Sequence, residues 1–355
     1  MKRARWLGIL GILAGSMALS LVAGEILFRI FVPREYKSPM LCLPGEQKQV
    51  PASEIYFFMR SLRDRERMGA GAAFRPYLFL KGWYDRPSWD YFDEDGCVDY
   101  LFNRFGFRDH DFEMKKKQGE YRIMALGDSF TLGVGVQLEH CWTEVLEKKL
   151  AQFLARPVEV INAGFAAGHQ PVMYEEWIKS DAMAFEPDGV IIGMCVNDMH
   201  PNIELLARIP PVIHKPWLGG YSRMLYRLQK YLAESKMPKE GVRDFSARVR
   251  ADPEPWNQVK EALISTKSFL DARGVRFIVV FLPALSGLRG EYPYAKLFQM
   301  AREFCEEEQI EYMDLLDRFL GCIDEEFWVH PTDQHPNPAG HRMIGEGIFE
   351  YLSRK

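Results

Sequence analysis

The chain has 355 residues and a formal net charge of −4, and 47% of its residues are hydrophobic. This length accommodates one sizeable domain together with an accessory region. The charge is small and no basic face stands out, so nucleic acid is not an expected partner.

The six cysteines are scattered and form no CxxC motif or Cys/His cluster, which argues against a zinc site. Cys141 and Cys195 fall in the predicted core, and we expect them to be buried thiols. An even number of cysteines in an exported chain permits disulfides, and Cys42 with Cys97 is the one candidate pair.

The amino terminus combines three basic residues with a long apolar stretch. Lys2, Arg3 and Arg5 precede an uncharged run from Trp6 to Gly24. At about 1.5 Å per residue a helix of this run spans roughly 28 Å, close to the thickness of a bilayer core. The basic cluster predicts that the amino terminus lies in the cytoplasm and that the residues after the run lie outside. We therefore expect a membrane anchor over residues 1–32.

Two other interpretations of the apolar run remain open. Ala18-Leu-Ser20 resembles a small-x-small cleavage site, so the run can be a signal peptide, although it is long for one. The third interpretation is a soluble cytoplasmic protein whose amino-terminal helix is buried.

Residues 33–118 form a region rich in aromatic residues, prolines and mixed charge. Segments such as Tyr77–Trp83 and Val98–Phe102 have the composition of short strands. The segment Asn103–Arg108 then leads into a polar, lysine-rich break. We interpret the region as a β-rich accessory region or linker without chemistry of its own.

From residue 119 to residue 355, predicted strands alternate with predicted helices. The expected strands are 123–126, 158–162, 189–193, 275–282 and 310–316. The expected helices are 142–154, 172–185, 256–272, 294–308 and 338–352. This alternation predicts a three-layer α/β/α sandwich around a mostly parallel five-stranded sheet. Residues of about 201–252 interrupt the rhythm and are expected to form a helical insertion.

Polar residues follow several of these strands. Ser129 follows the first strand, Asn162–Gly168 the second and Asn197 the third, while Asp333 and His335 directly precede the last helix. Open α/β sheets gather such loops at one edge, where ligands bind. A serine attacks an ester when a base takes its proton and donors hold the oxyanion. Taken alone, Ser129 can equally be an ordinary helix-capping serine.

These segments resemble the blocks of the SGNH, or GDSL-type, hydrolase family over Tyr121–Lys355. Gly127-Asp-Ser-Phe130 is similar to the nucleophile block, and Asn162–Gly168 to the second block. Gly193–Asp198 is similar to the third block, and His335-Pro-Asn337 to the block that carries the base. Asn103–Arg108 is also similar to a segment of membrane-anchored bacterial members.

The resemblance implies a role for each residue. Ser129 is expected to be the nucleophile, and His335 its general base. The backbone N–H groups of Ser129 and of the second block, together with the Asn197 side chain, are expected to form the oxyanion hole. The position that aligns with the second-block donor is Ala167, with Gly168 next to it. The resemblance implies no metal and no organic cofactor.

The acid departs from the family pattern. The usual position, three residues before the histidine, holds Thr332, whereas Asp333 lies two residues before His335. Residues two apart in an extended segment point to the same side, so Asp333 can reach His335. We therefore expect Asp333 to be the acid, with a dyad assisted by a backbone carbonyl as the alternative.

The resemblance predicts a serine esterase or acylhydrolase acting outside the cytoplasmic membrane. Its substrate is expected to be a lipid, an acetylated glycan or a small ester. The alternatives are an O-acyltransferase acting on surface polysaccharide and a catalytically silent, membrane-anchored binding protein.

Overall fold

The computed structural model of the protein describes residues 2–32, 36–37, 39–42, 49–51, 71, 73–87, 89–165, 170–199, 222, 224–225, 227–228, 231–232 and 245–354. The chain divides into two compact units. One contains Met1–Tyr36 and Arg208–Gly241, and the other contains Lys37–Ala207 and Val242–Lys355.

A five-stranded parallel sheet forms the centre of the second unit. Its strands are β5 (Tyr121–Gly127), β6 (Val158–Gly164), β7 (Gly189–Met194), β8 (Arg276–Phe281) and β9 (Tyr312–Asp314). They lie in the order β6-β5-β7-β8-β9, and each neighbouring pair is parallel. This order reverses direction between β5 and β7, which is the doubly wound arrangement. The expected fold class is confirmed.

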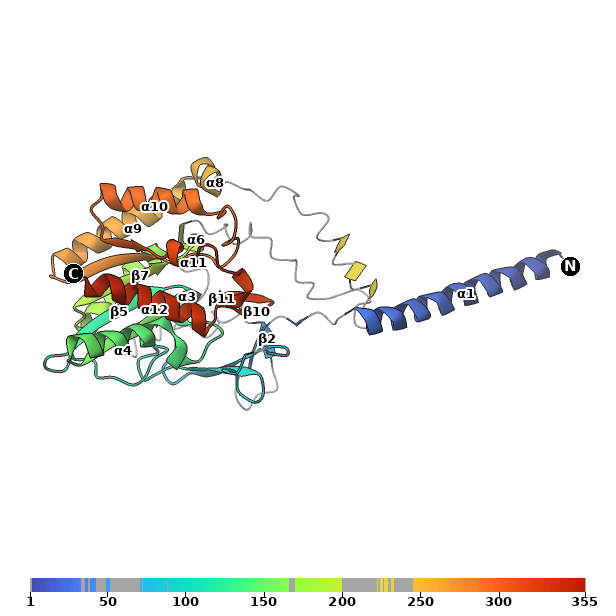
Figure 1. Cartoon of the computed structure of the whole chain (residues 1–355), viewed down its shortest axis with the longest axis horizontal. Helices are drawn as coiled ribbons and strands as arrows, with labels where there is room; N and C mark the ends of the chain where they lie inside the picture. Colours follow the sequence, from blue (N-terminus) through green and yellow to red (C-terminus); the bar gives the residue numbers. More distant parts are fainter. Residues whose placement is uncertain are drawn as a thin grey trace. The chain divides into compact units, whose positions relative to one another are not determined.

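Helices cover both faces of this sheet (Figure 1). They are α4 (Trp142–Leu154), α5 (Pro171–Ser180), α9 (Glu254–Asp271), α10 (Ala295–Glu307) and α12 (Pro338–Ser353). Helix α4 packs against α12, and α5 packs against α9. Because right-handed crossovers place the helices that follow β5 and β9 on one face, α4 and α12 form one outer layer and the other three form the second.

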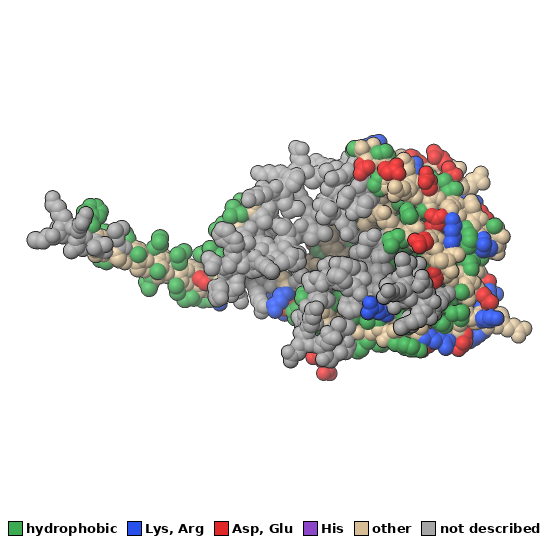
Figure 2. All heavy atoms as spheres, turned by 180° about the vertical axis from the view of Figure 1, so that it is seen from behind, with side chains coloured by type: hydrophobic (Ala, Val, Ile, Leu, Met, Phe, Trp, Pro, Cys, Tyr) green, Lys and Arg blue, Asp and Glu red, His purple; other side chains and the backbone are tan. Residues whose placement is uncertain are grey.

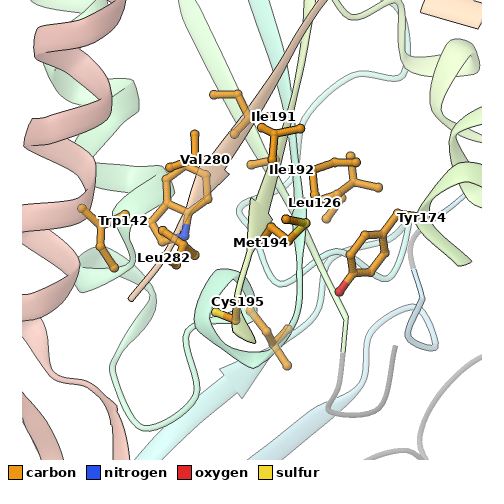
Figure 3. Close-up of a cluster of buried hydrophobic side chains, with 14 of the residues drawn as sticks. Leu126, Trp142, Tyr174, Ile191, Ile192, Met194, Cys195, Val280 and Leu282 are labelled. Atoms are coloured by element: carbon orange, nitrogen blue, oxygen red, sulfur yellow. The ribbon is translucent and has the colours of Figure 1, made fainter. Parts of the chain in front are cut away.

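The core lies between these layers. Strands β5, β7 and β8 are buried on both faces, which explains their continuous apolar sequences. Figure 3 shows Trp142 and Tyr174 on opposite sides of these strands, and both are fully buried. Cys141 and Cys195 are buried as expected.

Several short helices and one short hairpin accompany these main elements. The short helices are α3 (Ser129–Leu132), α6 (Val196–Met199), α8 (Phe245–Ala251) and α11 (Leu316–Phe319). The 3-10 helices are Leu138–His140, Ala182–Phe185 and Asp324–Glu326, and β10 (Trp328–His330) pairs with β11 (Asp333–Pro336). Most of the insertion expected at about 201–252 lies outside the described residues.

A second, antiparallel sheet belongs to the same compact unit. Its strands are β1 (Met40–Cys42), β2 (Gln49–Pro51), β3 (Phe79–Trp83) and β4 (Cys97–Leu101), in the order β2-β1-β3-β4. Cys42 and Cys97 lie on strands that flank β3, and no disulfide joins them, so the candidate pair is not formed. We call this sheet, the residues that connect β3 to β4, and the segment 102–109 that follows β4 the accessory layer.

Arg108 joins the accessory layer to the loop that follows α3. Its guanidinium is 1% exposed and lies 4.3 Å from the ring centroid of Tyr100. It donates hydrogen bonds to four backbone carbonyls: Asp99 at 3.1 Å, Leu132 at 2.9 Å, Val136 at 2.5 Å, and Gly133. A buried cation needs such acceptors, so the loop must keep the shape that presents them.

The other unit contains α1 (Lys2–Phe31). Its segment Gly11–Phe31 has 21 residues, is long and apolar enough to cross a membrane, and has no buried residues. Figure 2 shows hydrophobic side chains along this helix, whereas acidic and basic side chains are interspersed on the visible described surface of the other unit. A membrane anchor and a signal sequence both have these properties.

We expect Arg108→Met to lower the midpoint of thermal unfolding by about 5 °C or more, because four buried carbonyl oxygens lose a charged donor. Arg104→Met is the matched control, since Arg104 lies in the same segment with its side chain 34% exposed. Thermal unfolding of the detergent-solubilised protein measures both. Equal shifts in the two variants would contradict a special role for Arg108.

Candidate active site

The turn after β5 presents Ser129. Asp128 caps α3 by accepting the backbone N–H of Phe130 at 2.9 Å, and Ser129 is the first residue of that helix. Gly127 has a φ of +153°, and a Cβ there would collide with the Thr131 side chain and the Gly193 carbonyl. Only glycine therefore permits this close turn at the carboxyl edge of the sheet.

The hairpin β10–β11 presents His335 and Asp333. Both residues lie on β11 and, being two apart, point to the same side of the strand. Asp333 Oδ1 lies 2.5 Å from His335 Nδ1 and also accepts the His335 backbone N–H at 3.1 Å. Thr332 is not in this arrangement, because its hydroxyl lies 2.7 Å from Nδ1 of His330.

Ser129, His335 and Asp333 form a continuous chain of hydrogen-bonding groups. His335 Nε2 lies 2.8 Å from Ser129 Oγ. An ionised carboxylate only accepts, so Nδ1 carries the imidazole proton and Nε2 is left to accept the serine hydroxyl. Burial alone would raise the pKa of Asp333, but the charge and hydrogen bonds of His335 outweigh burial and hold this pKa below its ordinary value. Asp333 is thus an anion at neutral pH.

Asn197 lies beside the serine turn. It sits in α6, directly after β7, and its Nδ2 donates to Asp128 Oδ2 at 2.9 Å. One of the two amide hydrogens is used in this bond, which fixes the plane of the amide and leaves the second hydrogen as a donor. Asn197 and Ser129 are thereby linked through Asp128.

The expected second-block donors, Ala167 and Gly168, lie outside the described residues. The structure describes the end of β6 that precedes them. There the Phe165 backbone N–H donates to the Gly127 carbonyl at 2.8 Å. A Cβ on Gly164 would collide with the backbone of Leu132. The second-block strand therefore ends against the serine turn.

The sequence profile of the GDSL-like lipase/acylhydrolase family matches residues 125–343, which is more than half of the chain. The chain belongs to this family. It is accordingly an ester-hydrolysing enzyme, and the resemblance inferred from the sequence is confirmed. No protein in a collection of curated sequences matches the chain significantly.

Several solved structures resemble parts of this GDSL-family enzyme. A lipolytic protein of the G-D-S-L family from Desulfitobacterium hafniense is 18% identical with a TM-score of 0.39, over 66% of this chain and 98% of its own. A lipase/acylhydrolase from Enterococcus faecalis is 15% identical with a TM-score of 0.41, over 66% and 96%. A variant of an acetyl-xylooligosaccharide esterase from Geobacillus Stearmophilus is 15% identical with a TM-score of 0.43, over 65% and 94%.

Three acidic or thiol groups gather behind the serine turn of the enzyme. The carboxylates of Asp128 and Asp198 and the thiol of Cys195 are buried within 4.8 Å of one another. Asp198 accepts the Cys195 backbone N–H at 2.7 Å and the Tyr174 hydroxyl at 3.1 Å. Since both carboxylates are bonded to donors, they serve to fix the turns after β5 and β7.

His341 on α12 is fully buried. Its Nδ1 accepts the backbone N–H of Trp142, the first residue of α4, at 3.2 Å. Burial, reinforced by the positive charge of Arg108, lowers the pKa of His341 to about 3. The α12 helix carries this histidine on its inner face, where it links α12 to α4.

Sequence reasoning missed two residues of the accessory layer that reach the site. The Tyr84 hydroxyl donates to Asp333 Oδ2 at 2.8 Å, and Arg108 holds the loop after α3. The expectation that this region has no chemistry of its own was incomplete. For Arg108 a signal existed, because Asn103–Arg108 resembles a segment of related proteins. For Tyr84 no local pattern exists, since its partner lies 249 residues away.

Replacing His341 by Asn should make stability less sensitive to acid. The unfolded histidine binds a proton near pH 6.5, whereas the folded one binds it near pH 3. The unfolded state therefore holds more protons between these values, and wild-type stability falls as the pH decreases through this window. At pH 5 the protonation of this one group in the unfolded state lowers the free energy of unfolding by about 2 kcal/mol. The asparagine oxygen can still accept the Trp142 N–H.

The measurement is the difference between the unfolding midpoints at pH 7 and pH 5. This difference should shrink in His341→Asn and stay unchanged in His110→Asn, whose side chain is 72% exposed. A His341→Asn difference as large as that of the wild type would mean that folded His341 titrates normally.

Proposed function

We propose that this enzyme is a serine esterase that cleaves an ester through an acyl-enzyme on Ser129. The observation that carries the proposal is the continuous hydrogen-bonded chain Ser129–His335–Asp333 at the carboxyl edge of the sheet. A serine hydroxyl is a weak nucleophile by itself and becomes a strong one when a positioned base removes its proton.

In the acylation step, Ser129 Oγ attacks the carbonyl carbon of the ester while His335 Nε2 takes the hydroxyl proton. The Asp333 carboxylate stabilises the imidazolium that results. The tetrahedral intermediate then collapses, and the alcohol leaves with the proton from His335. A water molecule, deprotonated by His335, attacks the acyl-enzyme in turn and releases the carboxylic acid.

The developing oxyanion needs donors close to Ser129. The Ser129 backbone N–H is at the first position of α3, where it has no intrahelical acceptor. The second amide hydrogen of Asn197 is held in place by the bond to Asp128. We propose that these two donors, together with the backbone of Ala167 or Gly168, form the oxyanion hole. Each such donor typically contributes about 10²- to 10³-fold to turnover.

The substrate is proposed to be an ester of a lipid, an acetylated glycan or a small alcohol. Transfer of the acyl group to a sugar hydroxyl would use the same acyl-enzyme. Product analysis in the presence of an added glycan distinguishes the two reactions. Hydrolysis releases the acyl group as the free acid, whereas transfer yields an acylated glycan.

The first test of the site is covalent labelling of the full-length protein in detergent with a fluorophosphonate. We expect one adduct, located on Ser129 by peptide mass spectrometry, which is absent from Ser129→Ala. Labelling should slow by about 10³-fold in His335→Ala, because the serine loses its base. His140→Ala is the control, since this histidine lies on the 3-10 helix Leu138–His140 and should label at the wild-type rate. A folded wild-type protein without an adduct would contradict the proposal.

We further propose that α1 is an uncleaved anchor and that the catalytic unit lies outside the cytoplasmic membrane. The support is the apolar segment Gly11–Phe31 of α1, preceded in sequence by Lys2, Arg3 and Arg5. In bacterial cells that express the full-length chain, the protein should sediment with membranes at its full mass. External protease should digest the catalytic unit. A soluble, shortened product would indicate cleavage of a signal peptide. A membrane-bound product that resists the external protease would indicate the opposite orientation.

A further inference from the structure

Both oxygens of the Asp333 carboxylate are bonded, and each is bonded to a different part of the protein. Oδ1 faces His335 within the same strand. Oδ2 accepts the hydroxyl of Tyr84, which directly follows β3 of the accessory layer. The two residues lie 249 positions apart in the chain. Asp333 is therefore held from two sides, one of which is outside the parallel sheet.

The bond from Tyr84 has a fixed direction. A carboxylate accepts only, so the phenol must donate. Burial, reinforced by the charge of Asp333, raises the pKa of Tyr84 well above its ordinary value, which keeps the phenol protonated. The hydroxyl is thus a donor, and Asp333 an acceptor, throughout the neutral pH range.

The position of Tyr84 is fixed by its surroundings. Its backbone N–H donates to the Gly96 carbonyl at 3.0 Å. Its ring lies 5.1 Å from that of Phe92 and 5.7 Å from that of His330, between ring centroids. The phenol is 2% exposed. Packing fixes the position of the ring, so the hydroxyl cannot follow the Asp333 carboxylate if that group rotates. The hydrogen bond therefore favours one orientation of the carboxylate.

A second tyrosine of the accessory layer contacts the loop after α3. The Tyr100 hydroxyl accepts the backbone N–H of Gly135 at 2.8 Å. The accessory layer therefore contacts both the carboxylate of Asp333, through Tyr84, and the loop that follows the helix of Ser129, through Tyr100.

We propose that Tyr84 is a positioning residue for the catalytic acid, and that the accessory layer is for this reason part of the catalytic unit. Tyr84 holds Oδ2 so that Oδ1 remains directed at His335 Nδ1. The support is needed because Asp333 lies only two residues before the histidine on one short strand. The inference rests on the proposed roles of Ser129, His335 and Asp333.

The test compares Tyr84→Phe with Tyr91→Phe in the full-length protein, using hydrolysis of p-nitrophenyl acetate. Tyr91 and Tyr84 both pack against the ring of Phe92, but the Tyr91 hydroxyl faces the Val329 carbonyl at 3.5 Å. We expect Tyr84→Phe to lower kcat by about tenfold, since a hydrogen bond to a charged group is lost. The KM should change less than twofold, and Tyr91→Phe should match the wild type.

A double-mutant cycle separates positioning from general support of the fold. If Tyr84 acts through the carboxylate, adding Tyr84→Phe to Asp333→Asn should lower kcat by less than twofold. A purely structural role would produce the same tenfold loss in both backgrounds. Equal losses would therefore overturn the inference.

A third variant covers the case in which Tyr84→Phe folds poorly. Replacement of Tyr84 by 4-aminophenylalanine keeps the ring and places an N–H donor at the same position. Its kcat should recover to within about threefold of the wild type, as expected for a restored donor. Recovery of the fold without recovery of kcat would contradict positioning.

The outcomes distinguish this inference from the proposed function. An active, Ser129-labelled wild type in which Tyr84→Phe and Tyr91→Phe behave alike would remove Tyr84 and leave the esterase intact. A wild type that neither hydrolyses the ester nor labels on Ser129 would remove the function itself, and the inference with it.

Discussion

The buried guanidinium of Arg108 is the interaction on which the geometry of this enzyme depends. A permanent cation that is 1% exposed has no water to solvate it and requires acceptors from the protein. Two of its acceptors are carbonyls of the loop after α3, a third is the carbonyl of Leu132 at the end of α3, and the fourth belongs to β4. The loop after α3, the helix that begins with Ser129, is therefore tied to the accessory layer by electrostatics.

The second tie between these parts is the bond from Tyr84 to Asp333. Arg108 contacts the loop after the helix of Ser129, and Tyr84 contacts Asp333. His335 lies between Ser129 and Asp333, with Nε2 at 2.8 Å from Ser129 Oγ and Nδ1 at 2.5 Å from Asp333 Oδ1. The accessory layer therefore contacts the protein near both Ser129 and Asp333, the two ends of the hydrogen-bonded series. Its removal would take away the contacts that hold the loop after α3 and the hairpin β10–β11.

The sequence predicted the parallel sheet well because apolar runs and helical spacing are local signals. The helix Trp142–Leu154 was predicted to the residue. Ser129, Asn197 and His335 could be singled out as candidates because each lies in a motif beside a predicted strand or helix. The burial of His341 was not foreseen, because it depends on the packing of α12 against α4. Tyr84 was missed for a similar reason, since its partner is 249 residues distant.

The sequence alone determined the family, the fold class and the residues that can form the site. These properties follow from apolar periodicity, from the order of the elements and from short motifs, and each of these signals is local in the sequence. Only the tertiary structure decided that the Asp333 carboxylate, and not a backbone carbonyl, faces His335 Nδ1, while Thr332 is turned toward His330. It also decided that the accessory layer contacts that carboxylate. Hydrogen bonds between distant segments depend on how strands and loops pack, and a local pattern does not contain that information.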